Sequence, residues 1–574
     1  MLPIIKLFDS SVLEIGPVEL EVTKNALLSI AEEMGAVLVK AAQSTNIKER
    51  RDCSAAVFDA NGLTVAQAEH QPLHLGSMLG IVSAVLKKYS IEEIHEGDMF
   101  ITNDPYSGGG THLPDITVAA PVYIGGELIA YVVNIAHHSD VGGRVAGSDS
   151  GDCVSIFEEG LRIPVVRVMA RAQLLDEVLA FITLNCRTPE ERVADLQAQF
   201  AANHVGIQRL EALAGKLGVG FLKAVFTALL ERGERKARLA IRQVPAGRYT
   251  FKDYLDDDGR GTQSIPIAVT ITVAGDEIHL DFTGSGPQAR GGVNLVWPAL
   301  QAAVLYALRA ILDPTIPSNG GYFNAVKITA PRGTITNAQP PAPVAGRSDA
   351  AQRVADVIFG ALAAAMPSRV VAGCNSSVTA TMFSGFDSER SRYYSYLETQ
   401  GGGSGARHNK DGLDGVQVHV TNTSNLPVEA LENEYPLLVD RLELIPDTGG
   451  RGEFRGGLGI RKDIRVVGHD CTFASHGDRQ HFPPWGLFGG EPGACGRFVI
   501  THASSGEAEL LRSGKVSEVE LHDGDVVSVQ TPGAGGWGLF RNRSNDLLDR
   551  DLAEGKVSPQ WAAGGTHRGS DSPN

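Results

Sequence analysis

Two histidines and one aspartate have types and spacing that suit a divalent metal ion. His112 and Asp115 lie three residues apart on a proline-containing turn. Two apolar runs follow, 116–123 and 128–136, and His137 ends the second of them. If the runs pair as a hairpin, His137 returns to the start of the first run. Two imidazoles and one carboxylate then converge, and coordination positions are left open for water or substrate.

Other polar residues are candidates to complete or support this set. Asp52 is a possible fourth ligand, although folding must bring it to the cluster from outside the hairpin. His74 and His138 are candidate catalytic residues that act as outer donors or proton shuttles. Asp140 is a third candidate, because carboxylates often orient metal-bound imidazoles and the imidazole of His137 is close in sequence.

Each of these residues also has an ordinary structural explanation. A histidine at a strand end is usually a half-buried, hydrogen-bonded side chain, and an aspartate in a Gly-Pro turn usually caps backbone amides. Asp52 could instead form an ion pair with Arg50 or Arg51. Spacing alone leaves both explanations open, but the concentration of His, Asp and Gly within residues 103–140 favours the metal site.

The elements that must position these residues can be predicted from apolar periodicity and turn residues. The N-terminal half predicts helices at 18–43 and 76–89, a hairpin at 55–66 around Asn61-Gly62, the two buried strands above, and two or three helices over 189–242 that break near 215–220. Further along, the patterns predict strands at 265–273 and 277–282, core helices at 299–312 and 349–367, and short strands over 442–531.

These elements predict a multi-domain α+β protein with an N-terminal mixed sheet and helices, a central α/β region and a C-terminal β-rich domain. The expected limits are an α/β domain with the metal site at 1–243, a β-rich domain with a helical insertion at 244–345, an α/β region with a Gly-rich loop at 346–441, a C-terminal β domain at 442–541 and a flexible tail at 542–574.

Composition excludes several classes of partner. The net charge of −16 over 574 residues repels phosphate backbones and anionic membranes, so neither nucleic acid nor a membrane is an expected partner. The six cysteines are scattered without a CxxC pair, which is typical of free thiols in a reducing compartment. No signal-peptide layout and no apolar run of about 18 residues is found, so we expect a cytoplasmic protein.

Ordered motifs along nearly the whole chain resemble those of a known family. They are Ile15-Gly16-Pro17-Val18-Glu19, Glu49-Arg50-Arg51-Asp52-Cys53-Ser54, Pro72-Leu73-His74-Leu75-Gly76-Ser77-Met78, the loop 103–115, Asn185-Cys186-Arg187-Thr188-Pro189, Pro317-Ser318-Asn319-Gly320-Gly321, Gly401-Gly402-Gly403-Ser404-Gly405, Asn422-Thr423-Ser424-Asn425-Leu426-Pro427, Phe454-Arg455-Gly456-Gly457 and Thr531-Pro532-Gly533-Ala534-Gly535-Gly536-Trp537. In this order they resemble the hydantoinase B/oxoprolinase B family, with N-methylhydantoinase, 5-oxoprolinase and caprolactamase.

The resemblance implies a division of labour between two subunits. His112, Asp115 and His137, with Asp52 upstream, match the family's metal ligands, and the ion would be zinc or manganese. A hydantoinase A-type partner would use ATP-Mg to activate a cyclic amide, which this subunit then opens by hydrolysis. The sequence fits this division, because no Gly-x-x-x-x-Gly-Lys-Ser/Thr phosphate loop occurs in it. The assembly expected is a hetero-tetramer or larger.

Two other functions stay open. The same resemblance includes the acetone and acetophenone carboxylases, so the chain could be a subunit of an ATP-dependent ketone carboxylase. A non-catalytic scaffold, whose His and Asp are structural and whose Gly-rich loops bind a partner, is an alternative of a different class. Serine hydrolases and thermolysin-type peptidases are excluded, because neither Gly-x-Ser-x-Gly nor His-Glu-x-x-His is present.

Overall fold

The N-terminal part of the computed structural model, which describes residues 15–68 and 71–564, is built on a seven-stranded sheet. The strand order is β2-β1-β5-β4-β3-β6-β7, and every pairing among the described strands is antiparallel. Tight hairpins join β1 to β2 and β4 to β5, and a hairpin requires antiparallel neighbours. The strands are β1 (Cys53–Asp59), β2 (Thr64–Ala68), β3 (Met99–Thr102), β4 (Asp115–Ile124), β5 (Glu127–His137), β6 (Val166–Ala170) and β7 (Gln173–Leu174).

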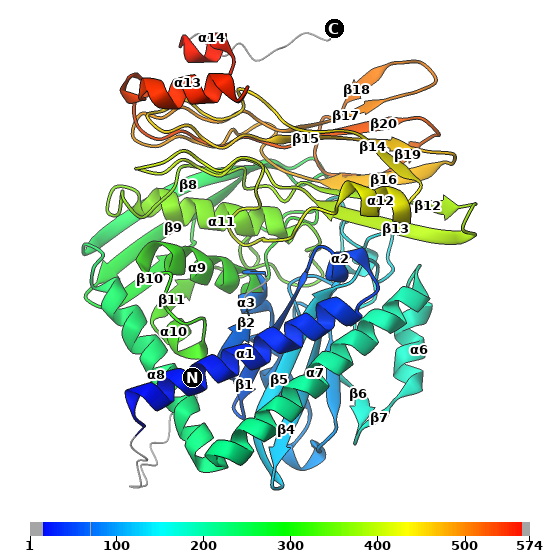
Figure 1. Ribbon diagram of the computed structural model, residues 1–574, viewed down its shortest axis with the longest axis vertical. Helices are drawn as coiled ribbons and strands as arrows, with labels where there is room; N and C mark the ends of the chain where they lie inside the picture. The colour runs from blue at the N-terminus through cyan, green and yellow to red at the C-terminus, as the bar shows by residue number, and fades with distance from the viewer. Residues whose placement is uncertain (1–14, 69–70, 565–574) are drawn as a thin grey trace.

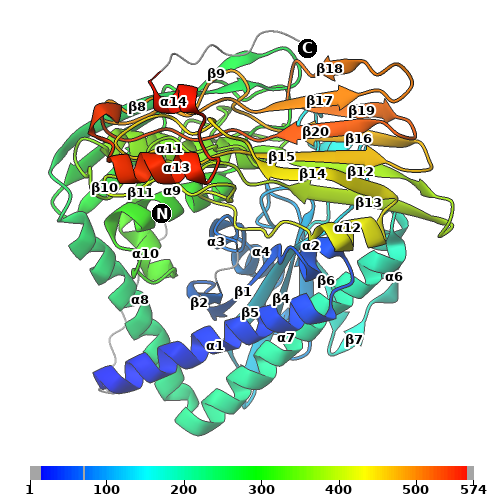
Figure 2. The same ribbon diagram turned by 45° about the horizontal axis from the view of Figure 1, so that its top comes forward.

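Both faces of this sheet are buried. Along β1, Ala55 and Val57 join a core that includes residues of α1 and α7, whereas Ala56 and Phe58 join a second core with α4. This alternation follows from the two-residue period of a strand. Figures 1 and 2 show α1 and α7 side by side across one face. The helices of this part are α1 (Pro17–Ala41), α2 (Thr45–Lys48), α3 (His74–Ser77), α4 (Ile81–Lys88), α5 (Ile156–Glu159), α6 (Asp176–Leu184), α7 (Pro189–Leu217) and α8 (Val219–Ile241).

The central part is a four-stranded sheet packed against two apolar helices. Its order is β11-β10-β9-β8, and only the β10–β11 pair among the described strands is parallel. Helices α9 and α11 bury most of their residues in the same core as the N-terminal helices. The elements are β8 (Gly247–Asp257), β9 (Gln263–Ala274), β10 (Glu277–Asp281), α9 (Trp297–Leu312), α10 (Gly320–Asn324), β11 (Val326–Thr329) and α11 (Arg347–Leu362).

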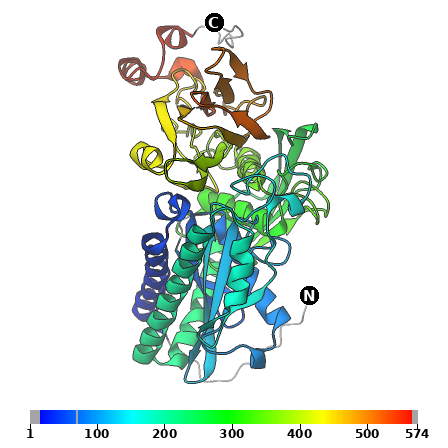
Figure 3. The same ribbon diagram turned by 90° about the vertical axis from the view of Figure 1, so that its right-hand side faces the viewer.

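The C-terminal part contains two sheets that share one core and lie at the opposite end from the N-terminal sheet (Figure 3). Their orders are β13-β12-β16-β19 and β14-β15-β20-β17-β18. The elements are β12 (Ala380–Asp387), β13 (Arg392–Thr399), α12 (Val428–Glu434), β14 (Leu437–Leu444), β15 (Ile460–Val466), β16 (Cys471–His476), β17 (Arg497–Thr501), β18 (Ala508–Leu510), β19 (Val516–Leu521), β20 (Val526–Gln530), α13 (Asn545–Ala553) and α14 (Pro559–Ala562).

The α+β, multi-domain fold class is confirmed, with three local differences. The expected mixture of strand directions occurs in the central sheet rather than in the N-terminal one. The helix expected at 76–89 is divided into α3 and α4 by a bend at 78–80. The domain limits stay a prediction up to residue 541.

The flexible tail expected from residue 542 is wrong as far as residue 564. Helices α13 and α14 occupy this segment, and the Trp561 side chain is buried, with its indole Nε1 donating to the Gly449 carbonyl at 3.3 Å. Arg543 and Asp551 are also buried and form an ion pair. The polar composition of this segment predicted a flexible tail, but these charged residues are paired inside the protein. Residues 565–574 lie outside the described part.

Within the described ranges, no single helix has both the length and the hydropathy of a membrane span. Helices α7 and α8 pass that test only as a pair, and they meet at an angle of 107°.

Candidate metal centre

The β4–β5 hairpin places Asp115 directly opposite His137. These residues are Cα partners at the open end of the hairpin, whose turn is made by Gly125 and Gly126 at φ +62° and +85°. Positive φ at both turn positions is favourable only for residues such as glycine. The tight turn and a register shift between Val122 and Tyr123 together set the strand register that brings the carboxylate and the imidazole together.

His112 joins this pair from the turn before β4. Its Nε2 lies 3.4 Å from Asp115 Oδ1, and its ring centroid lies 4.9 Å from that of His137. One candidate ligand atom from each residue lies within 4.8 Å of the other two. The structure thus brings together the three side chains whose spacing predicts a metal site.

Three of the possible ligand atoms of this cluster are buried and unsatisfied. His112 and Asp115 are 0% exposed, and both ring nitrogens of His112 and the Oδ1 of Asp115 have no hydrogen-bond partner. Buried polar atoms without partners are rare, because each forfeits its hydration. Two imidazoles and a carboxylate converging with free lone pairs fit a divalent cation of the zinc or manganese type.

The charge states of Asp115 and His137 suit a cation, whereas His112 has a raised pKa. Burial and Arg347 lower that pKa, but the Asp115 and Asp149 carboxylates outweigh them. Burial alone would raise the pKa of Asp115, but His112 and the Arg347 guanidinium, 3.1 Å from Asp115 Oδ2, hold that pKa well below its usual range. Burial lowers the pKa of His137 to about 4. An ionised carboxylate and a neutral imidazole are the ligand forms of these side chains.

Asp52 and His74 lie beside the cluster. Strand β1 pairs with β5, and the Asp52 carbonyl accepts the His137 backbone N–H at 3.0 Å. His74 Nε2 lies 3.9 Å from Asp52 Oδ1 and 3.7 Å from Asp115 Oδ1, while its Nδ1 is 3.0 Å from the Ser54 hydroxyl. The alternative ion pair with Arg50 is not formed, because that guanidinium donates to Asn46, the Leu397 carbonyl and the Thr399 hydroxyl.

His138 and Asp140 do not join the cluster. His138 Nε2 is 3.0 Å from Gln199 Oε1 on α7. The expectation that Asp140 orients His137 is wrong, because its carboxylate accepts from the Gly142 and Arg187 backbone N–H groups and from the Arg187 guanidinium. Asp140 therefore folds the following loop back onto the N-terminus of α7, and closeness in sequence did not indicate closeness in space.

Three residues near the cluster were missed in the sequence. Asp149 Oδ1 lies 3.8 Å from His112 Nδ1, and its Oδ2 lies 3.2 Å from His476 Nε2. Arg347 comes from the start of α11. Asp149 follows the Gly- and Asp-rich loop that flanks His137, so its local composition was a usable signal. No local pattern connects Arg347 or His476 to the hairpin, because both approach through the tertiary fold.

A pocket opens beside the cluster between the N-terminal sheet and the C-terminal part. Its wall contains charged and imidazole groups of the cluster, hydroxyl groups and a few aliphatic side chains. The lining residues are Asp52, Gln71, Leu73, His74, His137, Asp149, Arg347, Ser348, Val378, Thr399, Val420, Thr421 and Thr423.

A multi-domain α+β fold with a buried His–Asp–His cluster beside a polar pocket defines a candidate metal-dependent protein. The chain belongs to the hydantoinase B/oxoprolinase family, whose model matches residues 16–539. It is 31% identical to a putative D-/L-hydantoinase subunit from Pseudomonas sp. (strain NS671), over 96% of this chain and 94% of that protein. It is 34% identical to 5-oxoprolinase 1 of Arabidopsis thaliana over 91% of this chain, but spans only 42% of that longer protein.

Solved structures support the same fold. The ATP-dependent caprolactamase from Pseudomonas jessenii matches with a TM-score of 0.87 and 29% identity over 95% of each chain. A nucleotide-free acetone carboxylase matches with a TM-score of 0.88 over 96% of this chain and 79% of that one. Its 20% identity shows the fold alone.

Proposed function

We propose that this chain is the metal-bearing, substrate-handling subunit of an ATP-dependent cyclic-amide hydrolase. The single observation that carries the proposal is the cluster of His112, Asp115 and His137, in which both His112 ring nitrogens and Asp115 Oδ1 are buried and unsatisfied and His137 lines a pocket. The relatives named for hydantoinase, 5-oxoprolinase and caprolactamase support a cyclic amide as the substrate class.

A separate ATP-binding partner of the hydantoinase A type is the second part of the proposal. The Arabidopsis 5-oxoprolinase is matched over only 42% of its length, so more than half of it has no counterpart in this chain. The name of the Pseudomonas relative describes one subunit of a hydantoinase rather than a whole enzyme. We propose that the partner phosphorylates the amide with ATP-Mg and that this chain opens the activated ring.

The side chains have distinct tasks in that ring opening. A divalent ion bound by His112, Asp115 and His137, with Asp52 as a fourth ligand, would polarise the activated carbonyl or lower the pKa of a bound water. The His74 ring is fixed through its Nδ1 by Ser54, so its Nε2 faces the Asp52 and Asp115 carboxylates and can hold a proton there.

Other groups of the pocket suit an amide ring. Ser348, Thr421 and Thr423 line the wall, and the Ser348 hydroxyl, which has no hydrogen-bond partner, can donate to a carbonyl or accept from a ring N–H. Water adds to the activated carbonyl carbon, the C–N bond breaks, and the ring nitrogen takes the proton. The acyl phosphate that remains is hydrolysed by a second water, which releases the carboxylic acid and inorganic phosphate. The aliphatic side chains of Leu73 and Val420 provide apolar contact for ring methylene groups.

The test is reconstitution with the ATP-binding partner. Ring opening of hydantoin, 5-oxoproline or caprolactam and ATP turnover are measured for each protein alone and for the mixture. Both activities are expected only in the mixture, and His112→Ala should abolish ring opening. ATP turnover by this chain alone would contradict the division of labour. Conversion of acetone and bicarbonate, without amide hydrolysis, would support the carboxylase instead. A fully active His112→Ala complex would leave only a scaffold role.

A further inference from the structure

Four buried side chains link the candidate metal centre to the C-terminal part. His112 Nδ1 lies 3.8 Å from Asp149 Oδ1, and Asp149 Oδ2 lies 3.2 Å from His476 Nε2. His476 Nδ1 lies in turn 3.2 Å from Asp349 Oδ2. Asp149 lies in the loop after β5, Asp349 in the first turn of α11, and His476 at the end of β16. Three regions of the chain thus meet in one carboxylate–imidazole series.

The charges in this series fix how the Asp149 carboxylate is used. Burial alone would lower the pKa of His476, but the Asp149 and Asp349 carboxylates raise it to about 10. An imidazolium between two carboxylates donates one N–H to each. This occupies Oδ2 of Asp149, whereas its Oδ1 has no hydrogen-bond partner and is the atom closest to His112 Nδ1. If Asp149 Oδ1 and His112 Nδ1 move closer by less than about 1 Å, their 3.8 Å separation becomes that of a hydrogen bond.

We infer that His476 is a positioning residue for the metal centre, because it holds Asp149 as the acceptor for the Nδ1–H of His112. That tautomer leaves Nε2 of His112, the nitrogen nearer Asp115, with its lone pair free for an ion. The inference rests on the metal site proposed above. It adds that a residue of the C-terminal part determines which nitrogen of His112 is available.

The surroundings of His476 indicate a fixed support rather than a mobile proton carrier. A Cβ atom at Gly151 would lie 3.0 Å from His476 Cβ, and one at Gly346 would lie 3.7 Å from its Cγ, so glycine backbone packs closely against the His476 side chain. At the far end, Asp349 is 0% exposed and its Oδ1 accepts the Val378 backbone N–H at 2.9 Å. At its Asp349 end the series therefore stops inside the protein.

The experiment measures metal affinity rather than turnover. The purified full chain is stripped of metal and titrated with Zn²⁺ in competition with a chromophoric chelator. His476→Gln and Asp149→Asn should each weaken Zn²⁺ binding about tenfold or more, as loss of an outer partner of a ligand does. The double variant should bind no more weakly than Asp149→Asn alone, because both residues act through one carboxylate.

A matched control is available in His419, which is also buried and paired with a carboxylate, Asp356, at 3.0 Å. Apart from His419, that carboxylate contacts Arg479 and Ser376 rather than a ligand of the candidate metal centre. His419→Gln should therefore keep the Zn²⁺ affinity within about twofold of the wild type, well short of the loss of an outer partner. Thermal unfolding of each variant checks that the fold is retained.

The outcomes separate this inference from the proposed function. If His112→Ala loses Zn²⁺ but His476→Gln and Asp149→Asn bind as the wild type does, the positioning role is overturned and the metal site stands. If His112→Ala binds Zn²⁺ normally, the metal site itself fails. Additive losses in the double variant would also overturn the positioning role. Should His476→Gln not fold, Asp149→Asn and Asp349→Asn decide: weakened binding supports the inference, and unchanged binding overturns it.

Discussion

The candidate metal centre and a second buried cluster, made of Asp356, Cys374 and His419, offer similar ligand atoms in opposite hydrogen-bond states. In each cluster the three candidate atoms lie within 4.8 Å of one another and all three residues are buried. In the metal centre both ring nitrogens of His112 and one oxygen of Asp115 lack partners. Both clusters therefore have a geometry that suits a metal ion, but they differ in whether their ligand atoms lack hydrogen-bond partners.

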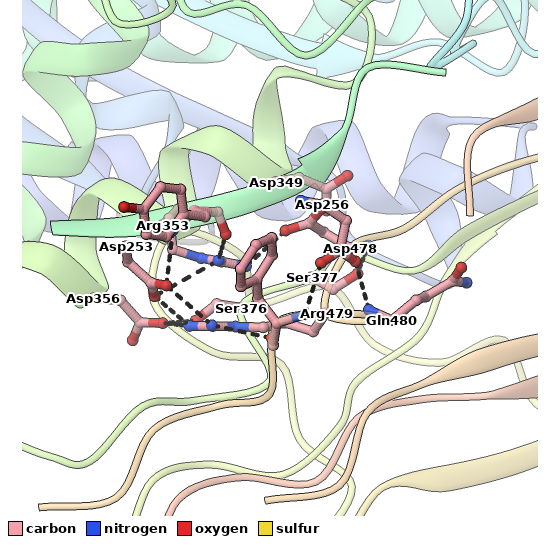
Figure 4. Close-up of polar contacts among 12 residues, drawn as sticks. Asp253, Asp256, Asp349, Arg353, Asp356, Ser376, Ser377, Asp478, Arg479 and Gln480 are labelled. Atoms are coloured by element: carbon pink, nitrogen blue, oxygen red, sulfur yellow. Dashed lines mark hydrogen bonds and ion pairs between the residues drawn. The ribbon is translucent and has the colours of Figure 1, made fainter. Parts of the chain in front are cut away.

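The second cluster is satisfied by the protein itself. His419 Nε2 lies 3.0 Å from Asp356 Oδ1, Arg479 donates to Asp356 Oδ2 at 2.7 Å, and the Gly405 N–H donates to Cys374 Sγ at 3.1 Å. Figure 4 shows Asp356 and Arg479 within a wider network of buried charges. A cation there would compete with the hydrogen bonds that already occupy Asp356 Oδ1 and Cys374 Sγ. Proximity of ligand atoms is therefore not enough to indicate a metal site. Buried ligand atoms that lack hydrogen-bond partners, beside a pocket, are stronger evidence for one.

The largest expected difference between the clusters is in metal binding. His112→Ala should lower Zn²⁺ or Mn²⁺ affinity by more than about 100-fold, because a lost ligand costs more than a lost outer partner. His419→Ala should leave the metal content of the purified protein unchanged. Elemental analysis and chelator competition measure both. Loss of the ion in His419→Ala with retention in His112→Ala would reverse the assignment of the two clusters.

The next largest difference is in stability. Asp356→Asn should lower the free energy of unfolding by about 1.5–3 kcal/mol, because Arg479 keeps its ion pair with Asp253 but loses the charged hydrogen bond to Asp356. Urea unfolding followed by tryptophan fluorescence measures this loss, and metal affinity should not change. Asp549→Asn, at an exposed position of α13, is the matched control and should shift stability by less than about 0.5 kcal/mol. Equal stability of Asp356→Asn and the wild type would show that the network contributes little.

The sequence was sufficient for the part of the candidate metal centre that one hairpin creates. His112, Asp115 and His137 meet because two apolar strands pair across a glycine turn, and that turn is readable in the sequence. Asp52 lies beside them because β1 pairs with β5, a pairing that periodicity and turn residues did not predict. The same reasoning failed for Asp140, since the loop after His137 turns toward Arg187.

The rest of the surroundings depends on tertiary packing. His476 reaches Asp149 from the C-terminal part, across a separation of 327 residues. Periodicity and turn residues predict that β16 is a strand, but not which element its last side chain contacts. The pairing of Asp356 with Arg479 was hidden for the same reason, since both lie in segments whose partners are set by how the central and C-terminal parts pack.

The smallest expected effect is a pH dependence confined to the satisfied cluster. Burial alone would lower the pKa of His419, but the Cys374 sulfur and the Asp356 carboxylate raise it to about 10. A histidine whose folded pKa is raised contributes stability that is fully present below its unfolded pKa of about 6.5 and is lost as pH rises through the folded value. The stability advantage of the wild type over His419→Gln should therefore shrink between pH 7 and pH 8, by on the order of 1 kcal/mol.

Urea unfolding at each pH measures this stability advantage, and His204→Gln, at an exposed position of α7, is the control that should show no such trend. An advantage that stays constant up to pH 9 would mean that His419 is held as a neutral ring, and the cluster would then be maintained by packing on Phe359 rather than by its charges.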